Sequence, residues 1–324
     1  MCGIVGILSF RERGSIDDRV IGRMRDTMAH RGPDGFDTWI SEDRKVGLGH
    51  RRLSIIDVGP AASQPMPNED GHVVITFNGE IYNHASLRPL LVAAGHRFRT
   101  DHSDTEVLVH GYEEWGPEGL LRRIEGDYAF GIWDGRKRSL FLARDRIGVK
   151  PLYFSFLNGY FLFASEMKGI VEHPNFVPDI DPHALYHYLS FLTAPAPMTL
   201  MRGVYKLPAG CSLTVETSGA ARMARYWDAV PGRGLDPSEI ANLSEKATEE
   251  FYIRGIRERL RAGVEKRMMS DVPLGVFLSG GIDSSTNVAL MSEYSPHPVE
   301  TFTVGFSDHT HLNEFEHAKA VADR

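Results

Sequence analysis

The second residue of the chain is a cysteine, and this position gives it unusual chemical potential. If Met1 is removed, Cys2 carries both a thiol and a free α-amine. The thiolate is the nucleophilic form of cysteine, and an α-amine with a pKa of about 7.7–8.0 can accept the thiol proton at neutral pH. One residue would then supply both nucleophile and base, as an N-terminal threonine does. The alternative is an ordinary buried cysteine at the start of a strand.

Three other positions could bind the polar parts of a small substrate. The side-chain amide of Asn78 and the N–H of Gly79, at the end of an expected strand, could together stabilise an oxyanion. Arg52 could bind a carboxylate through two parallel hydrogen bonds, and Asp104 could pair with an ammonium group. Each has a plainer alternative: a type I′ Asn-Gly turn, a surface ion pair for Arg52, and a helix cap for Asp104.

A glycine-rich segment lies between an expected strand and an expected helix in the last quarter of the chain. Glycines allow close approach of the backbone, and N–H groups at a helix N-terminus bind anionic oxygens. The segment has neither the Gly-Lys-Ser/Thr ending of a Walker loop nor the spacing of a dinucleotide fingerprint. Phosphate binding and a plain strand-to-helix turn both remain open. The segment consists of Leu278, Ser279, Gly280, Gly281, Ile282, Asp283 and Ser284.

Short apolar runs dominate the first half of the chain and predict antiparallel strands interrupted by a few helices. Such an order favours two sheets packed face to face and covered by helices, an α+β layered domain. Asp134-Gly135 is a hairpin signal between two of the runs. Helices are expected at 17–29, 85–94 and from 104 to about 115. The expected strands are 2–10, 46–50, 73–78, 128–133, 139–143, 152–155 and 160–164.

The second half of the chain changes character. A helix is expected at 181–192, and 198–248 is interpreted as connecting structure, with a polar segment from Pro231. A long helix at 249–269 comes next. The order then becomes strand 274–278, glycine-rich loop, helix 284–293 and strand 301–305, which is typical of an α/β nucleotide-binding domain. The sequence stops inside an expected helix, so we expect this second domain to be truncated.

Composition excludes several classes of function. The 324 residues are 42% hydrophobic and 24% charged, as in ordinary globular proteins. A net charge of −7 without a basic block argues against a nucleic-acid partner. No apolar run is long enough to span a membrane. Two cysteines form no disulfide framework and fit a reducing compartment, so we expect a cytoplasmic protein.

Taken together, these segments resemble the class II, N-terminal-nucleophile glutamine amidotransferases, and within them the glutamine-hydrolysing asparagine synthetases. The resemblance runs along essentially the whole chain and implies an αββα Ntn-hydrolase-type domain followed by an ATP-pyrophosphatase-type synthetase domain. It implies a glutaminase domain at 2–190, a connecting segment at 191–247 and the first part of a synthetase domain at 248–324. The matching segments are 2–4, 30–34, 50–55, 78–83, 103–106, 143–146, 150–153, 164–168, 270–273 and 279–284.

The resemblance also implies roles for individual residues. Cys2, freed of Met1, would attack the side-chain amide of glutamine, with its own α-amine as proton acceptor. The oxyanion hole would be formed by Asn78 and Gly79. The substrate's α-carboxylate would be held by Arg52, and its α-ammonium by Asp104 with help from Glu80.

Ammonia would cross an internal tunnel to the second domain, as in the family. There the 278–284 loop would bind the pyrophosphate of ATP with Mg²⁺, and Val304 and Gly305 would lie near adenine. Aspartate would be adenylated, and ammonia would displace AMP to give asparagine. Two departures stand out. The chain ends before a later family signature of the synthetase site, and Gly126-Asp127-Tyr128 stands where the family often has Gly-Met-Phe.

Two alternative functions remain at this stage. A relative of the same architecture could amidate another carboxylate, and a non-catalytic descendant could only bind glutamine. The resemblance further implies a homodimer. No metal site is identified, because histidines such as His30, His50, His72, His84 and His110 are scattered without cysteine partners at ligand spacing.

Overall fold

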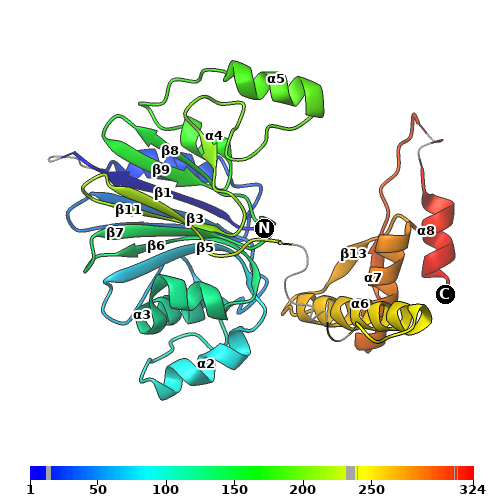
Figure 1. The fold of residues 1–324 in the computed structure, drawn as a ribbon. Coiled ribbons are helices and arrows are strands. Elements are labelled where there is room, and N and C mark those ends of the chain that lie inside the picture. Colours follow the sequence, from blue (N-terminus) through cyan, green and yellow to red (C-terminus); the bar gives the residue numbers. More distant parts are fainter. Residues whose placement is uncertain (12–15, 231–237, 239, 310, 312) are drawn as a thin grey trace. The chain divides into compact units, whose positions relative to one another are not determined.

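The chain forms two units in the computed structural model, Met1–Ala229 and Val230–Arg324. The structure describes residues 1–11, 16–230, 238, 240–309, 311 and 313–324 (Figure 1). The start of the polar segment expected from Pro231 onward, residues 231–237 and 239, therefore lies outside the described residues. None of the helices in the described part combines the length and the apolar character that crossing a bilayer would need.

The first unit is built on two antiparallel sheets. The first sheet has the strand order β10-β8-β9-β1-β3-β2, and the second has the order β12-β11-β7-β6-β5-β4. The strands of the first sheet are β1 (Gly3–Ser9), β2 (Gly35–Ile40), β3 (Val46–Arg52), β8 (Tyr153–Leu157), β9 (Tyr160–Ala164) and β10 (Tyr205–Lys206). Those of the second are β4 (Met66–Pro67), β5 (Val73–Ile81), β6 (Gly126–Asp134), β7 (Ser139–Arg144), β11 (Cys211–Glu216) and β12 (Ala221–Arg225).

The alternation of side chains along β1 shows why the sheets stack. Ile4 and Leu8 belong to the core between the two sheets, together with residues of β6, β7 and β11. Val5 and Ile7 belong to a separate core on the opposite face, beneath a helix. Because successive strand residues point to opposite faces, a strand that is apolar at every position must be covered on both sides.

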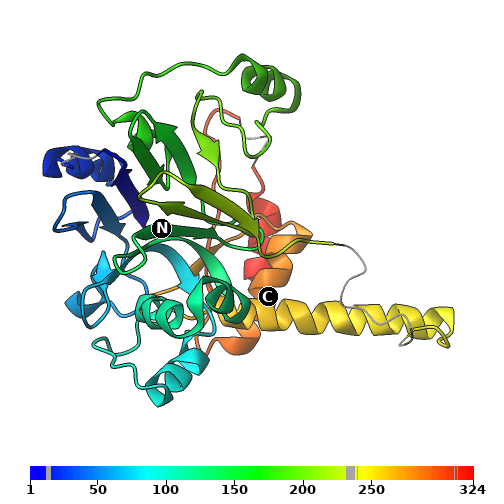
Figure 2. The same ribbon diagram turned by 60° about the vertical axis from the view of Figure 1, so that its left-hand side comes forward.

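Helices supply the two outer layers. α1 (Asp18–Asp26) and α4 (Met167–Val171) cover the first sheet, and α2 (His84–Ala93) and α3 (Asp104–Arg123) cover the second. Figures 1 and 2 both show α2 and α3 together beneath the second sheet. The unit also contains α5 (Pro182–Phe191) and a 3₁₀ turn, η1 (Pro60–Ala62). The expected αββα layering is therefore confirmed.

Three local expectations differ from the structure. The edge strand β2 was not expected, because its side chains are only partly buried and lack a clear alternation. α3 runs on to Arg123 through a kink at Gly116, whose φ of 67° lies in the left-handed region. The part of the expected connecting segment up to Ala229 supplies strands to both sheets, with β11 pairing with β7, so the first unit does not end at residue 190.

The second unit has two short parallel strands, β13 (Gly275–Phe277) and β14 (Glu300–Phe302). Three helices accompany them in the described residues: α6 (Glu245–Arg267), α7 (Ile282–Tyr294) and α8 (Phe315–Ala322). α6 begins at Ser244, whose hydroxyl accepts a hydrogen bond from the N–H of Ala247 at 3.3 Å. The strand–loop–helix–strand order expected from the sequence is confirmed, with boundaries shifted by a few residues.

Candidate active site

Cys2 is held at the entrance of β1 by contacts to β3 and to the loop after it. The N–H of Leu53 donates to the Cys2 sulfur at 3.4 Å, and the thiol lies 3.6 Å from the Leu53 carbonyl oxygen. The neighbouring residue Gly3 pairs with Arg51 across the sheet. As a residue, Cys2 is partly exposed, which differs from the fully buried strand cysteine considered from the sequence.

A second group of side chains fixes the backbone of Cys2. Nε of Arg31 donates to the Cys2 carbonyl oxygen at 2.8 Å, and Nη1 of Arg31 lies 3.1 Å from the Glu166 carboxylate. The hydroxyl of Ser165 accepts a hydrogen bond from the N–H of Ile4 at 3.0 Å. No role was predicted from the sequence for Arg31, Ser165 or Glu166. They lie in two segments that carry the resemblance, and their task is to orient the first residues of β1.

All six residues expected to form the glutaminase site line one hollow. Its volume is about 540 Å³, with the open mouth included. They come from four places: the start of β1, the end of β3, the middle and end of β5, and the start of α3. Met1, Gln64 and Lys150 also line the hollow. The six expected residues are Cys2, Arg52, Asn78, Gly79, Glu80 and Asp104.

Asn78 lies inside β5, where it pairs with Ala129 of β6. The Asn-Gly turn considered from the sequence is therefore wrong, since the strand continues to Ile81. The side chain of Asn78 is 1% exposed, yet its Nδ2 has no hydrogen-bond partner. An unpaired buried N–H group is costly and rare. Because Asn78 lines the hollow, this amide is available as a donor to an oxygen bound there.

Gly79 is required by close packing rather than by an unusual backbone angle. A Cβ at this position would lie 2.3 Å from the carbonyl oxygen of Asp127 and 2.7 Å from the Cα of Tyr128. Both contacts are to the backbone of β6 and cannot be relieved by a rotamer change. Any side chain here would push β5 away from β6 and displace Asn78.

Asp104 is the first residue of α3, but its carboxylate binds outside its own helix. Oδ2 accepts a hydrogen bond from the N–H of Ile81 on β5 at 3.0 Å. The residue is 5% exposed. Burial, reinforced by the charge of Glu80 and opposed by the Ile81 N–H, raises the pKa of Asp104 to about 7. Such a carboxyl is partly protonated at neutral pH and would ionise fully beside a cation.

Arg52 lies at the end of β3 and donates to main-chain carbonyls. Nη1 donates to Gly59 at 2.9 Å, and Nη2 donates to Asp57. These bonds hold the 57–59 loop beside the hollow. A guanidinium has five N–H donors, so Arg52 keeps capacity for a carboxylate. Its partners in the structure do not match the surface ion pair considered from the sequence.

The groups around the Cys2 sulfur oppose one another electrostatically. Burial raises the pKa of the Cys2 thiol, while the Leu53 N–H and the chain's amino group lower it. Burial also lowers the pKa of the Met1 amino group. A lowered pKa leaves more of an amine unprotonated at neutral pH; this shift belongs to the Met1 amine, not to the amine that Cys2 would carry after removal of Met1.

Gln64 braces the hollow and was missed from the sequence. Its Oε1 accepts a hydrogen bond from the N–H of Phe77 at 2.7 Å, and its Nε2 donates to the Thr105 hydroxyl at 3.1 Å. It thus ties β5 to α3, one residue from Asn78 and one from Asp104. No sequence signal indicated this role, because it depends on contacts between residues far apart in the chain.

In the second unit, the glycine-rich loop connects β13 to α7. Gly280 has a φ of 82°, and a Cβ there would lie 2.5 Å from the backbone of His317 on α8. The hydroxyls of Ser279 and Ser284 hydrogen bond to each other at 3.0 Å. Gly281 precedes α7 and has no side chain that could cap the helix. The loop therefore presents the amide groups of the first turn of α7, which are of the kind that bind phosphate.

The other two residues expected at the nucleotide site follow the neighbouring strand. β13 and β14 are parallel and pair Phe277 with Phe302. Leu278 and the segment of Val304 and Gly305 therefore leave the same edge of the sheet. The hydroxyl of Thr303 donates to the Leu278 carbonyl at 2.7 Å and ties the two segments together. This edge is where α/β sheets bind ligands.

Comparisons with known proteins agree with this arrangement. A model of the glutamine amidotransferase domain matches residues 1–227, and a model of asparagine synthase matches residues 255–324. The chain is 39% identical, over 99% of its length, to asparagine synthetase (glutamine-hydrolyzing) 1 of Bacillus subtilis strain 168, of which it covers 48%. It is 33% identical, over 95% of its length, to asparagine synthetase (glutamine-hydrolyzing) 3 of the same strain, again covering 48%.

The chain thus spans about half the length of these curated relatives. Among solved structures, glutamine phosphoribosylpyrophosphate (PRPP) amidotransferase from B. subtilis, complexed with ADP and GMP, superposes with a TM-score of 0.51 at 19% identity. The match covers 69% of this chain and 49% of that one, and at this identity it shows the shared fold alone. Because the amidotransferase model matches more than half of the sequence, the chain belongs to the glutamine amidotransferase domain family.

Proposed function

We propose that the first unit hydrolyses the side-chain amide of glutamine to glutamate and ammonia, with Cys2 as the nucleophile. The observation that carries this proposal is the convergence of a partly exposed cysteine and an unpaired buried amide donor. Cys2 and Asn78 both line one hollow, and Nδ2 of Asn78 is buried without a partner. Acyl transfer needs a nucleophile, a proton acceptor and an oxyanion site, and this hollow can supply all three.

The proposed reaction begins after removal of Met1, which itself lines the hollow. The α-amine of Cys2 takes the thiol proton, and the sulfur attacks the amide carbon. The oxygen becomes an oxyanion that accepts hydrogen bonds from Nδ2 of Asn78 and the N–H of Gly79. The carbon–nitrogen bond then breaks, and the ammonium of Cys2 returns its proton to the leaving nitrogen. Water hydrolyses the thioester with the same amine as base.

The polar ends of the substrate have separate partners among the residues that line the hollow. In the proposed complex, Arg52 binds the α-carboxylate, and Asp104 and Glu80 bind the α-ammonium. The buried carboxyl of Asp104 is neutral below its raised pKa, so pairing with the ammonium draws it into the charged form. Substrate binding therefore releases a proton from Asp104 when the pH lies near or below 7.

The chain offers a matched pair of variants that tests the nucleophile. Cys2→Ala should reduce glutamate release from glutamine to the background rate. Cys211→Ala, which removes the chain's other thiol from β11, should retain most of the wild-type rate because Cys211 belongs to the core between the sheets. Near-normal glutamate release by the Cys2→Ala protein would refute the proposed mechanism.

We further propose that the second unit contributes to an ATP-dependent asparagine synthetase. The 278–284 loop would bind the pyrophosphate of ATP through the amides of α7, with Mg²⁺ offsetting the phosphate charge and Val304 and Gly305 near the base. Aspartate would be adenylated, and ammonia from the first unit would displace AMP. The match of residues 255–324 to asparagine synthase supports this proposal.

Nucleotide binding can be measured on the chain itself. Asp283→Ala should weaken binding of ATP with Mg²⁺ in calorimetry, while the exposed Asp308→Ala serves as the control. Equal affinities in all three proteins would argue against the loop as the phosphate site. The acceptor is tested by following AMP formation from ATP and glutamine with aspartate and with other carboxylates.

We also propose a cytoplasmic location and a homodimer. The unpaired state of both cysteines agrees with a reducing compartment. Light scattering of the purified chain tests the assembly state, and a monomer at micromolar concentration would contradict the dimer.

A further inference from the structure

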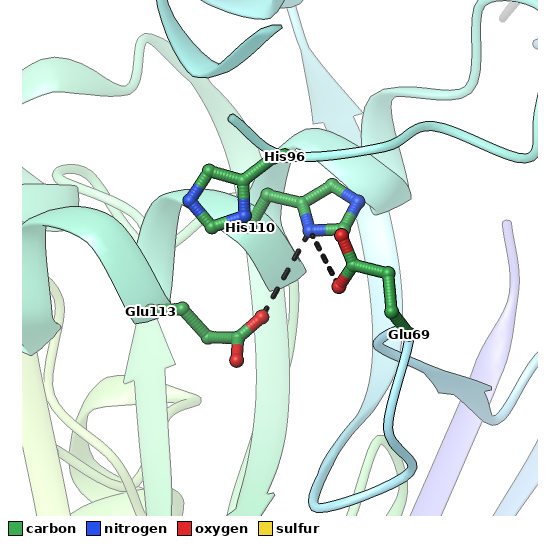
Figure 3. A group of neighbouring side chains, drawn as sticks. All are labelled: Glu69, His96, His110 and Glu113. Carbon is green, nitrogen blue, oxygen red and sulfur yellow. Dashed lines mark ion pairs between the residues drawn. The ribbon is translucent and has the colours of Figure 1, made fainter. Parts of the chain in front are cut away.

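Four side chains from different parts of the sequence meet beside α3. Glu69 lies in the loop between β4 and β5, and His96 lies in the loop between α2 and α3. His110 and Glu113 are three residues apart on α3 and therefore share a face. One ligand-type atom from each residue lies within 4.8 Å of the others. Figure 3 shows the four side chains pointing toward one another.

His110 is the most informative member of this cluster. Its side chain is 1% exposed, and neither ring nitrogen has a hydrogen-bond partner. Nδ1 lies 3.5 Å from Oε2 of Glu69 and 3.8 Å from Oε2 of Glu113, and the latter oxygen is also buried without a partner. Buried polar atoms are seldom left unpaired, so an occupant between these groups is expected.

The spacing suits a tetrahedral ion. Zinc binds nitrogen and oxygen at about 2.0–2.2 Å, so its ligand atoms lie about 3.4 Å apart. The two distances from Nδ1 of His110 exceed this value by about 0.1 and 0.4 Å, and the ligand atoms of the cluster, which lie within 4.8 Å of one another, would draw closer around the ion. The His96 ring lies beside the His110 ring, with centroids 4.9 Å apart.

Neighbouring groups hold the far sides of these ligands. Oε1 of Glu113 accepts a hydrogen bond from Asn68 at 2.7 Å, and Oε1 of Glu69 accepts one from the N–H of Arg97 at 3.0 Å. In both cases Oε2 is left toward the cluster. Metal-binding histidines usually direct their second nitrogen at a carboxylate. Nε2 of His110 has such a neighbour in Glu106, at 3.6 Å.

We propose that Glu69, His96, His110 and Glu113 form a structural site for one zinc ion. Two imidazoles and two carboxylates match the donor preference of zinc, whereas Mg²⁺ and Ca²⁺ prefer six or more oxygen ligands. The two carboxylates balance the charge of the ion. Four protein ligands would leave no open position, which indicates a structural rather than a catalytic site.

A proton bound to His110 would compete with zinc for this site. Burial favours the neutral ring of His110, but Glu106, Glu113 and Glu69 outweigh it and raise the pKa of His110 to about 9. Zinc binding would displace that proton, as is usual when histidine becomes a ligand. The bound ion would fasten α3, which begins at Asp104, to the β4–β5 loop and the α2–α3 loop.

Zinc binding by the untagged chain tests the proposal. The measurements use a Cys2→Ala background, because a thiol beside an α-amine could itself bind zinc. After chelator treatment and dialysis, ZnCl₂ is titrated into the protein in competition with a chromogenic chelator, which gives the affinity for zinc. Mass spectrometry counts the zinc ions bound per chain. Three further variants are compared: His96→Gln, Glu69→Gln, and His183→Gln as an exposed control histidine on α5. Circular dichroism confirms that each is folded.

We expect one zinc per chain in the background protein and in the His183→Gln control. The affinity for zinc should fall by more than 100-fold with His96→Gln or Glu69→Gln. This loss exceeds the about 10–100-fold that removal of a residue supporting a metal ligand costs. Zinc should also slow amide hydrogen exchange at residues 68–72 and 95–100 of the background protein. This measurement does not depend on substituting a proposed ligand. Absence of zinc binding, equal affinity in all variants, or unchanged exchange in those loops would overturn the proposal.

Discussion

Replacing Asp104 by asparagine should weaken glutamine hydrolysis and, at the same time, stabilise the first unit above neutral pH. The substitution keeps the size of the side chain and its acceptor for the Ile81 N–H. It removes only the ability to ionise. Activity and stability should therefore change in opposite directions, which distinguishes a buried binding carboxylate from a purely structural one.

The stability effect follows from the raised pKa of Asp104. Between pH about 4 and about 7, the unfolded carboxyl is ionised while the folded one remains protonated, so the folded state binds more protons and loses stability as the pH rises. A shift from 3.8 to about 7 corresponds to at most about 4 kcal/mol at about 1.4 kcal/mol per pKa unit. The Asp104→Asn protein avoids this cost, so its advantage should grow with pH and level off above about 7.

The activity effect depends on the charge of the same carboxyl. Losing one partner of a buried charge pair costs about 2–5 kcal/mol, and 3 kcal/mol corresponds to about 150-fold in kcat/KM at pH 8. Below about pH 7 the wild-type carboxyl is increasingly protonated. The ratio of wild-type to variant kcat/KM should therefore fall by up to tenfold per pH unit toward parity. The titration of the Cys2 amine affects both proteins, so it cancels when the kcat/KM of the wild type is divided by that of the variant.

Two assays measure these changes. Glutamate release gives kcat/KM from pH 5 to 8. Urea unfolding followed by tryptophan fluorescence gives stability, and all four tryptophans of the chain (Trp39, Trp115, Trp133 and Trp227) lie in the first unit. The control is Asp101→Asn, whose side chain is 94% exposed. A pH-independent activity ratio, or a stability difference that does not grow with pH, would refute the assignment of Asp104.

Two further substitutions test how the site is built. Asn78→Ala removes the unpaired Nδ2 and should lower kcat for glutamine about 10²–10³-fold with little effect on KM. An unchanged kcat in a steady-state assay would exclude Asn78 from the oxyanion site. Arg31→Gln removes the Nε donor to the Cys2 carbonyl and the contact to Glu166, so the first residues of β1 should loosen. We expect at least a tenfold loss of kcat/KM with a folded core by circular dichroism, and full activity would show that Arg31 does not position Cys2.

Much of the fold was predictable because its signals are local. Ile4, Val5, Ile7 and Leu8 form a short apolar run bounded by glycine and charge, which predicts a strand covered on both faces. The structure places alternate residues of this run in two different cores. The strand–loop–helix–strand order of the second unit was equally readable, since the apolar runs and the glycines alternate over short distances.

Other features could not be read because they depend on partners far away in the sequence. Asn78-Gly79 has the composition of a hairpin turn, yet pairing with β6 carries the strand straight through it. The 211–225 segment joins the second sheet only because β7 offers an unpaired edge to β11. At Asn78-Gly79 tertiary pairing outweighed local turn chemistry, whereas the turn at Ser218-Gly219, a hairpin signal in the sequence, does join β11 to β12.

The features of the candidate site also divide into those that were predictable from the sequence and those that only the structure revealed. Cys2, Arg52, Asn78, Gly79 and Asp104 were found as separate residue types with a chemical use, and the resemblance added Glu80. Their meeting in one hollow came from the structure. The cluster around His110 gave no sequence signal at all, since its members come from two loops and a helix without the short ligand spacings of known zinc motifs.

The state of the N-terminus in active protein decides whether Cys2 is the nucleophile. Intact-mass spectrometry, combined with peptide mapping of a trapped glutamine-derived thioester, reports both whether Met1 is present and which sulfur is acylated. The active chain should lack Met1 and carry the acyl group on Cys2. Full glutaminase activity in protein that retains Met1, or a thioester on Cys211, would contradict this mechanism.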